Sequence, residues 1–129
     1  MHIEHIAIWV ADLERMRTFY ETYFNGRANP KYSNPGTGFT SYFISFDSGT
    51  RLEIMHRADI GDNPNTVQRE HRGYVHLAIA VGSKAQVNAL TEILRQNGCA
   101  IIGEPRTTGD GYYESVVLDP EGNQIEITL

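Results

Sequence analysis

The sequence has no excess of positive charge. Its 129 residues carry 11 Lys and Arg against 16 Asp and Glu, which gives a formal net charge of −5 and a pI of about 5.4. Nucleic-acid-binding proteins normally present a basic stripe, so this balance argues against that class. The same charge gives no reason to expect binding at an anionic membrane surface.

Long apolar segments and cysteines are also scarce. No stretch approaches the roughly 18 apolar residues of a membrane span. The opening MHIEHIAIWVADLERM contains charges and has neither a basic n-region nor a small-residue cleavage site, so we expect no signal peptide. The single cysteine, Cys99, cannot form an intrachain disulfide, which fits a reducing cytoplasm. With no histidine nearby in the sequence, Cys99 is interpreted as a small buried residue and not as a nucleophile.

The chain does contain an internal repeat of one pattern of strands and helix. With 40% hydrophobic residues, it can form one domain or two half-domains that share a sheet. The first module, 1–56, is predicted to hold a strand over 2–10, a helix over 12–26 between the cap Asp12 and the stop Gly26, a loop over 28–39, and strands over 41–46 and 51–55. The second module, 74–129, is predicted to hold a strand over 74–81, a helix over 83–98 with the capping box Ser83 and Gln86, a short strand over 100–102, a loop over 103–111, and strands over 112–118 and 124–129. Residues 57–73 are polar and form the candidate linker.

The two modules also match residue by residue. HIAIWV corresponds to HLAIAV, and FDSGTRLEIM corresponds to LDPEGNQIEIT with one inserted turn residue. Glu53 follows His5 by 48 residues, and Glu126 follows His76 by 50. Because side chains alternate along a strand, these four residues all lie on the face opposite the Ile, Leu and Val positions. If the two half-sheets curl into one cup, the four side chains converge inside it.

Two imidazoles and two carboxylates form a suitable shell for one divalent transition metal ion, with Ni, Zn, Co, Mn and Fe as candidates. Four protein ligands leave open positions on an octahedral ion, as a catalytic site requires. A bound ion would also offset the cost of holding carboxylates away from bulk water. We therefore predict the metal ligands His5, Glu53, His76 and Glu126.

These motifs resemble the vicinal oxygen chelate superfamily, which includes glyoxalases, bleomycin resistance proteins and extradiol dioxygenases. They are most similar to bacterial glyoxalase I-like proteins, and the resemblance covers essentially the whole chain. It implies an α+β fold of two βαβββ repeats that form a cup-shaped, mostly antiparallel sheet with the helices on the outer face. It also implies a homodimer in which the cup is built within one chain or across two.

The resemblance further implies a lyase or isomerase that abstracts a proton next to a carbonyl. The substrate would be a hemithioacetal of a 2-oxoaldehyde or a related small oxygen-chelating compound, with glutathione or another thiol as candidate cosubstrate. Glu126 is expected to be the mobile base and Glu53 its counterpart. The sheet face that carries the four predicted metal ligands is called the ligand face below. Strand parity adds Trp9, Arg51, Met55, Tyr113 and Ser115 to this face, and the first four are candidate substrate-binding residues. The loop 107–113 is a candidate lid.

Two positions depart from the glutathione-dependent relatives. Trp9 stands where those proteins usually carry an arginine, and Arg57 stands where they usually carry an asparagine. Three alternatives stay open: a fosfomycin-type transferase or hydrolase, an acyl-CoA epimerase, and a non-catalytic antibiotic-binding protein. The epimerases usually have a glutamine at the first-half carboxylate position, and the binding proteins lose the ligands.

Overall fold

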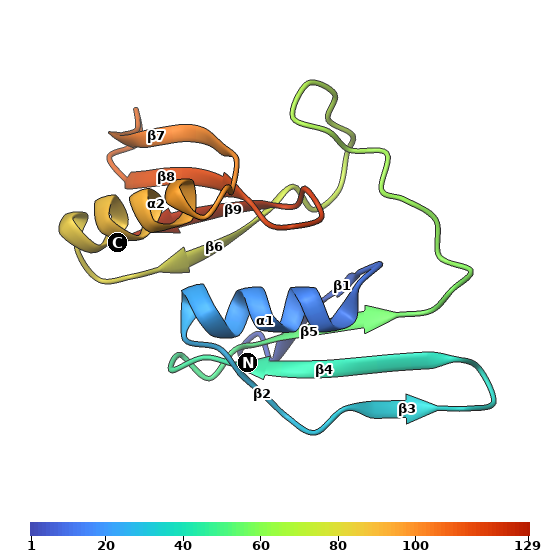
Figure 1. Ribbon diagram of the computed structural model, residues 1–129. Helices are drawn as coiled ribbons and strands as arrows, with labels where there is room; N and C mark the ends of the chain where they lie inside the picture. The colour runs from blue at the N-terminus through green and yellow to red at the C-terminus, as the bar shows by residue number, and fades with distance from the viewer. The chain divides into compact units, whose positions relative to one another are not determined.

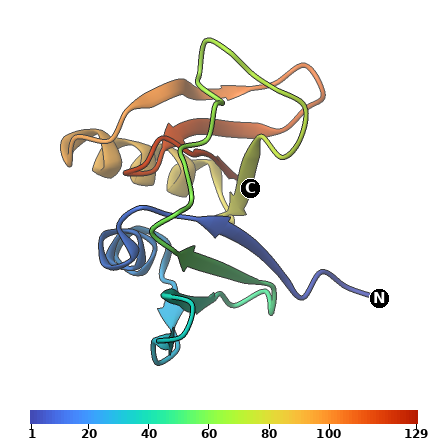
Figure 2. The same ribbon diagram turned by 90° about the vertical axis from the view of Figure 1, so that its right-hand side faces the viewer.

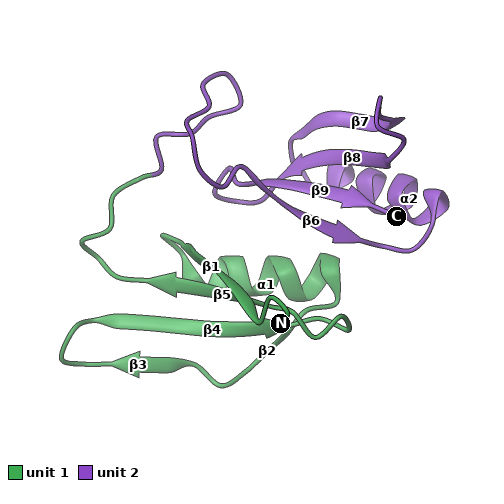
Figure 3. Cartoon of the chain, turned by 180° about the vertical axis from the view of Figure 1, so that it is seen from behind, with its two compact units in different colours: residues 1–62 green, residues 63–129 purple.

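The structure is a computed structural model that describes residues 1–129. The chain divides into two compact units, Met1–Asp62 and Asn63–Leu129 (Figure 3). The boundary lies inside the polar segment 57–73, which contains no helix and only an isolated bridge between Thr66 and Arg69. Neither of the two helices has the length and apolar character needed to cross a lipid bilayer.

Unit 1 is one helix on a mixed sheet. Its elements are β1 (His5–Trp9), α1 (Leu13–Phe24), β2 (Arg27–Ala28), β3 (Tyr32–Asn34), β4 (Phe39–Ser45) and β5 (Arg51–His56). The sheet order is β1-β5-β4-β2, and β3 also pairs with β4. Only β1 and β5 run parallel, and the other pairs are antiparallel. Helix α1 lies along one face of this sheet and is seen end-on in the second view (Figures 1 and 2).

Unit 2 repeats this arrangement. Its elements are β6 (His76–Ala80), α2 (Lys84–Gln96), β7 (Ile101–Thr107), β8 (Tyr113–Leu118) and β9 (Gln124–Thr128). The sheet order is β6-β9-β8-β7, again with one parallel pair, β6 with β9, followed by antiparallel pairs. The predicted α+β fold of two βαβββ repeats is confirmed, with the second strand of unit 1 broken into the short pieces β2 and β3.

Each unit buries its apolar side chains between its helix and its sheet. In unit 1 the buried side chains include Met16 and Tyr20 from α1 and Ile44, Leu52 and Ile54 from the sheet. In unit 2 they come from α2, β8 and β9: Val87, Leu94, Val117, Ile125 and Ile127. Burying an Ile or Leu side chain contributes about 1.5–3 kcal/mol, so these contacts fix which face of each sheet meets the helix. The other face is left for polar side chains.

The predicted helix caps are largely confirmed. The side chain of Asp12 accepts a hydrogen bond from the Arg15 amide, and that of Ser83 accepts one from the Gln86 amide. The stop of α1 differs in detail, because Asn25, with φ of 53°, takes the left-handed position predicted for Gly26. Gly26 is needed for space instead, since a Cβ there would lie 2.5 Å from the Ile44 side chain.

Two predicted loops were wrong in extent. Residues 28–39 contain β3 and the end of β2, and residues 103–111 contain most of β7. Strand β7 is the edge of its sheet and has register shifts on both sides of Gly103, which is where a proline such as Pro105 is tolerated in a strand. Glycine and proline therefore marked an irregular edge strand here and not a loop.

Candidate functional site

A histidine and a glutamate occupy matching positions in the two units. In unit 1, His5 pairs with Arg51 across the parallel strands β1 and β5, and Glu53 pairs with Ala7. In unit 2, His76 pairs with Gln124 across β6 and β9, and Glu126 pairs with Ala78. Both pairs are therefore diagonal neighbours in the same register.

The sheet neighbours of these residues point the other way. Leu52 and Ile54 flank Glu53, and Ile125 and Ile127 flank Glu126, all of them buried under a helix. Because side chains alternate along a strand, each His–Glu pair lies on the sheet face away from its helix. The placement predicted for the four residues, relative to the helices, is what each unit shows.

Within each pair the imidazole faces the carboxylate. His5 Nε2 lies 4.0 Å from Glu53 Oε2, and His76 Nε2 lies 3.3 Å from Glu126 Oε2. The glutamates are the more enclosed partners, with 14% of the Glu53 side chain and 22% of the Glu126 side chain exposed. Each unit therefore holds a largely covered carboxylate beside a more exposed histidine side chain.

These separations fit two donors on a common ion. Two donors about 2.1 Å from one ion are about 3.0 Å apart at a right angle, about 3.4 Å apart at the tetrahedral angle and at most about 4.2 Å apart when opposite. The His76–Glu126 distance lies close to the tetrahedral value, and the His5–Glu53 distance lies between the tetrahedral and the opposite values. The structure gathers no cluster of three or more His, Cys, Asp or Glu side chains suited to a metal ion, so the donors occur as two pairs, one in each unit.

His5 has a second carboxylate partner. Its Nδ1 contacts one carboxylate oxygen of Glu4, and the other oxygen of Glu4 pairs with the Arg51 guanidinium. The hydrogen bond from His5, reinforced by Arg51, holds the pKa of the Glu4 carboxyl below its usual value. Sequence reasoning missed Glu4, although the contrast between Glu4-His5 and Val75-His76 in the aligned repeats was visible.

Arg51 lies on the ligand face, as predicted, but its charge already has a partner. Its guanidinium carbon is 4.2 Å from the centroid of the Phe43 ring, and it pairs with Glu4. Phe43 pairs with Glu53 across β4 and β5, and its ring meets the His5 ring edge-on at 5.3 Å between centroids. Arg51 and Phe43 are thus part of the surroundings of His5.

Trp9 and Met55 lie side by side further along the ligand face. They are register partners on β1 and β5. Trp9 is 41% exposed and meets Phe39 edge-on at 6.0 Å between centroids, while Phe39 also packs against Tyr32. Arg57 lies over the Trp9 ring, 5.5 Å from its centroid. Trp9 and Arg57, the two positions at which the sequence departs from the pattern expected of glutathione-dependent relatives, are therefore in contact.

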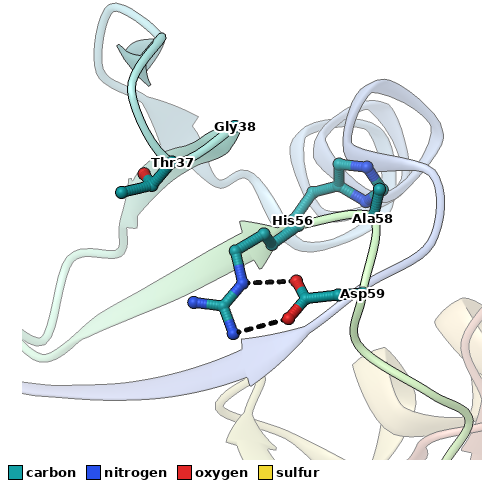
Figure 4. A pocket seen from close by; sticks show the side chains of 6 residues that line it. Thr37, Gly38, His56, Ala58 and Asp59 are labelled. Atoms are coloured by element: carbon teal, nitrogen blue, oxygen red, sulfur yellow. Dashed lines mark hydrogen bonds and ion pairs between the residues drawn. The ribbon is translucent and has the colours of Figure 1, made fainter.

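A shallow hollow adjoins the end of β5 (Figure 4). It is lined by Thr37, Gly38, His56, Arg57, Ala58 and Asp59. Two nitrogens of Arg57 donate to the two carboxylate oxygens of Asp59, at 2.5 and 3.1 Å, so two of the lining residues are bonded to each other. The hollow includes neither His–Glu pair.

The face predicted for Tyr113 and Ser115 was wrong. The Tyr113 hydroxyl donates to Asn88 of α2 at 2.8 Å, and the Ser115 hydroxyl bonds Thr91 of α2 at 2.6 Å. The strand register explains the error. Val116 pairs with Glu126 and so shares its face, and the adjacent residue Ser115 therefore lies on the helix side. Tyr113 is part of the packing of α2 against its sheet.

The same register puts an unexpected carboxylate on the ligand face of unit 2. Glu114 is two residues from Val116, is 9% exposed, and has one oxygen 3.8 Å from the Arg106 guanidinium.

The candidate lid, 107–113, is a turn closed by hydrogen bonds of Thr108, whose amide donates to the Tyr112 carbonyl at 2.8 Å. Cys99 is half-buried, and burial raises the pKa of its thiol, the opposite of what a nucleophile needs.

Comparison with known proteins gives a consistent result. The sequence family described as the Glyoxalase/Bleomycin resistance protein/Dioxygenase superfamily matches residues 2–127. The uncharacterized protein YqjT of Bacillus subtilis (strain 168) is 28% identical over 131 residues, which is 97% of this chain and 96% of that protein. Among solved structures, a glyoxalase family protein from Enterococcus faecalis superposes with a TM-score of 0.80 at 21% identity, over 99% of this chain and 97% of that one.

A second solved structure is that of an enzyme with a stated activity. The trypanothione-dependent glyoxalase I of Leishmania major superposes with a TM-score of 0.78 at 25% identity, covering 99% of this chain and 86% of that one. Both structures share the repeated helix-on-sheet architecture found here. With its family match over nearly every residue, the chain belongs to the Glyoxalase/Bleomycin resistance protein/Dioxygenase superfamily.

Proposed function

We propose that this protein is a metal-dependent lyase or isomerase of the glyoxalase I type. Its substrate would be the hemithioacetal of a 2-oxoaldehyde or a similar small compound with adjacent oxygens. The observation that supports this proposal most directly is the His–Glu pair repeated in identical register, His5 with Glu53 and His76 with Glu126. A catalytic imidazole or carboxylate acting alone would not need to occur in both repeats.

In this proposal the two pairs combine into one shell for one divalent ion, chosen among Ni, Zn, Co, Mn and Fe. The pairs would come from the two units of one chain or from two chains of a homodimer. When bound, the ion supplies Lewis acidity that stabilises negative charge on the substrate oxygens. The two imidazoles would hold the ion through ring nitrogens, and the two carboxylates would balance its charge.

Glu126 would be the residue that moves the proton. Its side chain is more exposed than that of Glu53, 22% against 14%, so it is freer to leave the shell. The carboxylate takes the hydrogen from the carbon next to the substrate carbonyl as a proton and returns it to the neighbouring carbon. The hydroxyl proton moves between the two oxygens, so the hemithioacetal becomes a 2-hydroxyacyl thioester with no external oxidant or reductant.

The ligand face of unit 1 would bind the rest of the substrate. Trp9 and Met55 offer an apolar wall beside the His–Glu pair. Arg57 is held between Trp9 and Asp59, and so the positions used for glutathione by bacterial relatives carry a different structure here. We therefore propose a thiol other than glutathione. The Leishmania major glyoxalase I is described as trypanothione-dependent, which is a precedent for another thiol among the structural neighbours. The protein is expected to act in the cytoplasm.

The test combines metal content with turnover. The purified protein is analysed for transition metals, loaded with each candidate ion, and assayed on hemithioacetals of methylglyoxal with several thiols. Glu126→Gln should keep the folded circular dichroism spectrum and lose most turnover, while the matched control Glu92→Gln, an exposed carboxylate of α2 in the same unit, should behave as wild type. A protein that neither contains nor takes up a transition metal would refute the proposal and favour a binding protein. Full turnover in Glu126→Gln would remove the base role from that residue.

A further inference from the structure

We propose that Glu4 is a positioning residue that fixes the orientation and tautomer of His5, and that Arg51 holds Glu4 in place for this task. The contacts that join Glu4 to His5 and to Arg51 are called the Glu4 array below. Unit 2 has no counterpart of this array. The two halves of the proposed shell are therefore unequal, with a preorganised imidazole in the first half and an unsupported one in the second. The consequence for metal binding rests on the proposed function, whereas the positioning of His5 does not.

The proton location on His5 follows from its partner. A carboxylate held by an arginine is ionised and can only accept hydrogen bonds. His5 Nδ1, which contacts Glu4, must therefore carry the hydrogen. In the neutral ring the lone pair is then on Nε2, the nitrogen that faces Glu53 at 4.0 Å. This is the nitrogen that a metal ion would use.

Glu4 is itself fixed at both its backbone and its side chain. Its carbonyl accepts a hydrogen bond from the Arg51 amide at 3.0 Å, which extends the pairing of β1 with β5 by one residue. Its side chain pairs with the Arg51 guanidinium. Arg51 is in turn stacked over Phe43, whose ring edge also meets the His5 ring. Each of these four side chains thus contacts two of the others: Glu4, His5, Phe43 and Arg51.

The second repeat places different residues at the equivalent positions. Val75 precedes His76 where Glu4 precedes His5, and Gln124 is the register partner of His76 where Arg51 is that of His5. Val75 offers no acceptor and Gln124 carries no charge. The array is thus a property of one repeat and not of the shared architecture.

This asymmetry has a chemical meaning. A carboxylate on the remote ring nitrogen of a metal-binding histidine orients the ring and raises its basicity, and losing such a partner typically weakens metal binding about 10–100-fold. His5 would thus be the firmer anchor for the ion. The half with Glu126 would be the looser one, as release of a proton-carrying carboxylate requires.

The first measurement is made on the metal-free protein. Two-bond proton–nitrogen correlation spectra at mildly alkaline pH distinguish the two imidazole tautomers. His5 should be in the Nδ1–H form in the wild type and should become a tautomer mixture in Glu4→Ala. The matched control is Glu14→Ala, which removes an ion-paired carboxylate of α1 and should leave His5 unchanged. A mixed tautomer in the wild type, or an unaltered His5 in Glu4→Ala, would overturn the positioning role.

The second measurement is zinc affinity by competition with a chromophoric chelator. Glu4→Ala should bind zinc about 10–100-fold more weakly than wild type and Glu14→Ala. Transferring the array to unit 2 with Val75→Glu and Gln124→Arg should tighten binding and move His76 to the Nδ1–H form. Equal zinc affinity in Glu4→Ala and wild type would overturn the anchoring role. A wild type that binds no metal but holds His5 in the Nδ1–H form would refute the proposed function and support the positioning.

Discussion

If one ion is shared by the two His–Glu pairs, removing a histidine from one unit must destabilise the metal-bound state of the other. A ligand present at about 100 times its dissociation constant stabilises the native state by about 2.7 kcal/mol. Unfolding entropy is about 2.1 cal/mol/K per residue, so for 129 residues this energy corresponds to a rise in Tm of about 10 °C. His5→Ala and His76→Ala should each lose most of that rise.

Amide hydrogen exchange then locates the effect. Saturating zinc should slow exchange in β5 and in β9 of the wild type, because each strand carries one ligand. His5→Ala should remove the protection in β9 of unit 2 as well as in β5. The control His71→Ala removes a histidine that is bonded to Asn65 and lies outside both pairs, so it should keep the full effect. Loss of protection in unit 1 alone would refute the shared ion and indicate two independent weak sites.

Three further predictions concern the structure around the site. Thr91→Val should cost about 1–3 kcal/mol of unfolding free energy in urea, because it strands the buried Ser115 hydroxyl, while Thr91→Val with Ser115→Ala should cost clearly less. Gly26→Ala should destabilise by about 1–3 kcal/mol in the same assay, since its Cβ would meet the Ile44 side chain. Because burial raises the pKa of Cys99, its alkylation by iodoacetamide should be slower than in the urea-unfolded chain and should keep rising to higher pH; equal rates would contradict this.

The sequence predicted the face of the two His–Glu pairs because two independent periods agree at them. Alternation along a strand placed His5 and Glu53 opposite the apolar core, and the repeat placed His76 and Glu126 in the same way. Buried leucine or isoleucine side chains on either side of each glutamate leave no ambiguity of face. The structure confirms the parity within each unit, and convergence of all four residues stays a prediction.

The strand over 112–118 lacked such a marker. Val116 and Val117 are both apolar and lie on opposite faces, so alternation alone did not decide which residues meet the helix. Glu114, which the sequence analysis did not single out, is buried on the ligand face beside Arg106. Only the pairing of Val116 with Glu126, a contact between strands, fixes the face. Register of this kind is a tertiary property that composition does not carry.

Glu4 was missed for a related reason. A charged residue just outside a strand end is ordinarily solvated, and its role depends on Arg51, which is 47 residues away in the chain. The internal repeat does contain the signal, but as a difference between the repeats and not as a match. A search for what the halves share finds the ligands, whereas a search for what they do not share finds Glu4, Arg51, Val75 and Gln124.

That difference bears on how the proposed duplicated site would act as an enzyme. Two equal His–Glu pairs would hold an ion symmetrically, and either carboxylate would be as hard to release as the other. Proton transfer needs one carboxylate that leaves the shell and an ion that stays. The first repeat adds a fixed anion behind its histidine and encloses its glutamate more fully, and the second does neither. In the proposed function the same register would thus serve two different tasks. The unequal surroundings of His5 and His76, more than the residues that the repeats share, are the feature that favours Glu126 as the moving group.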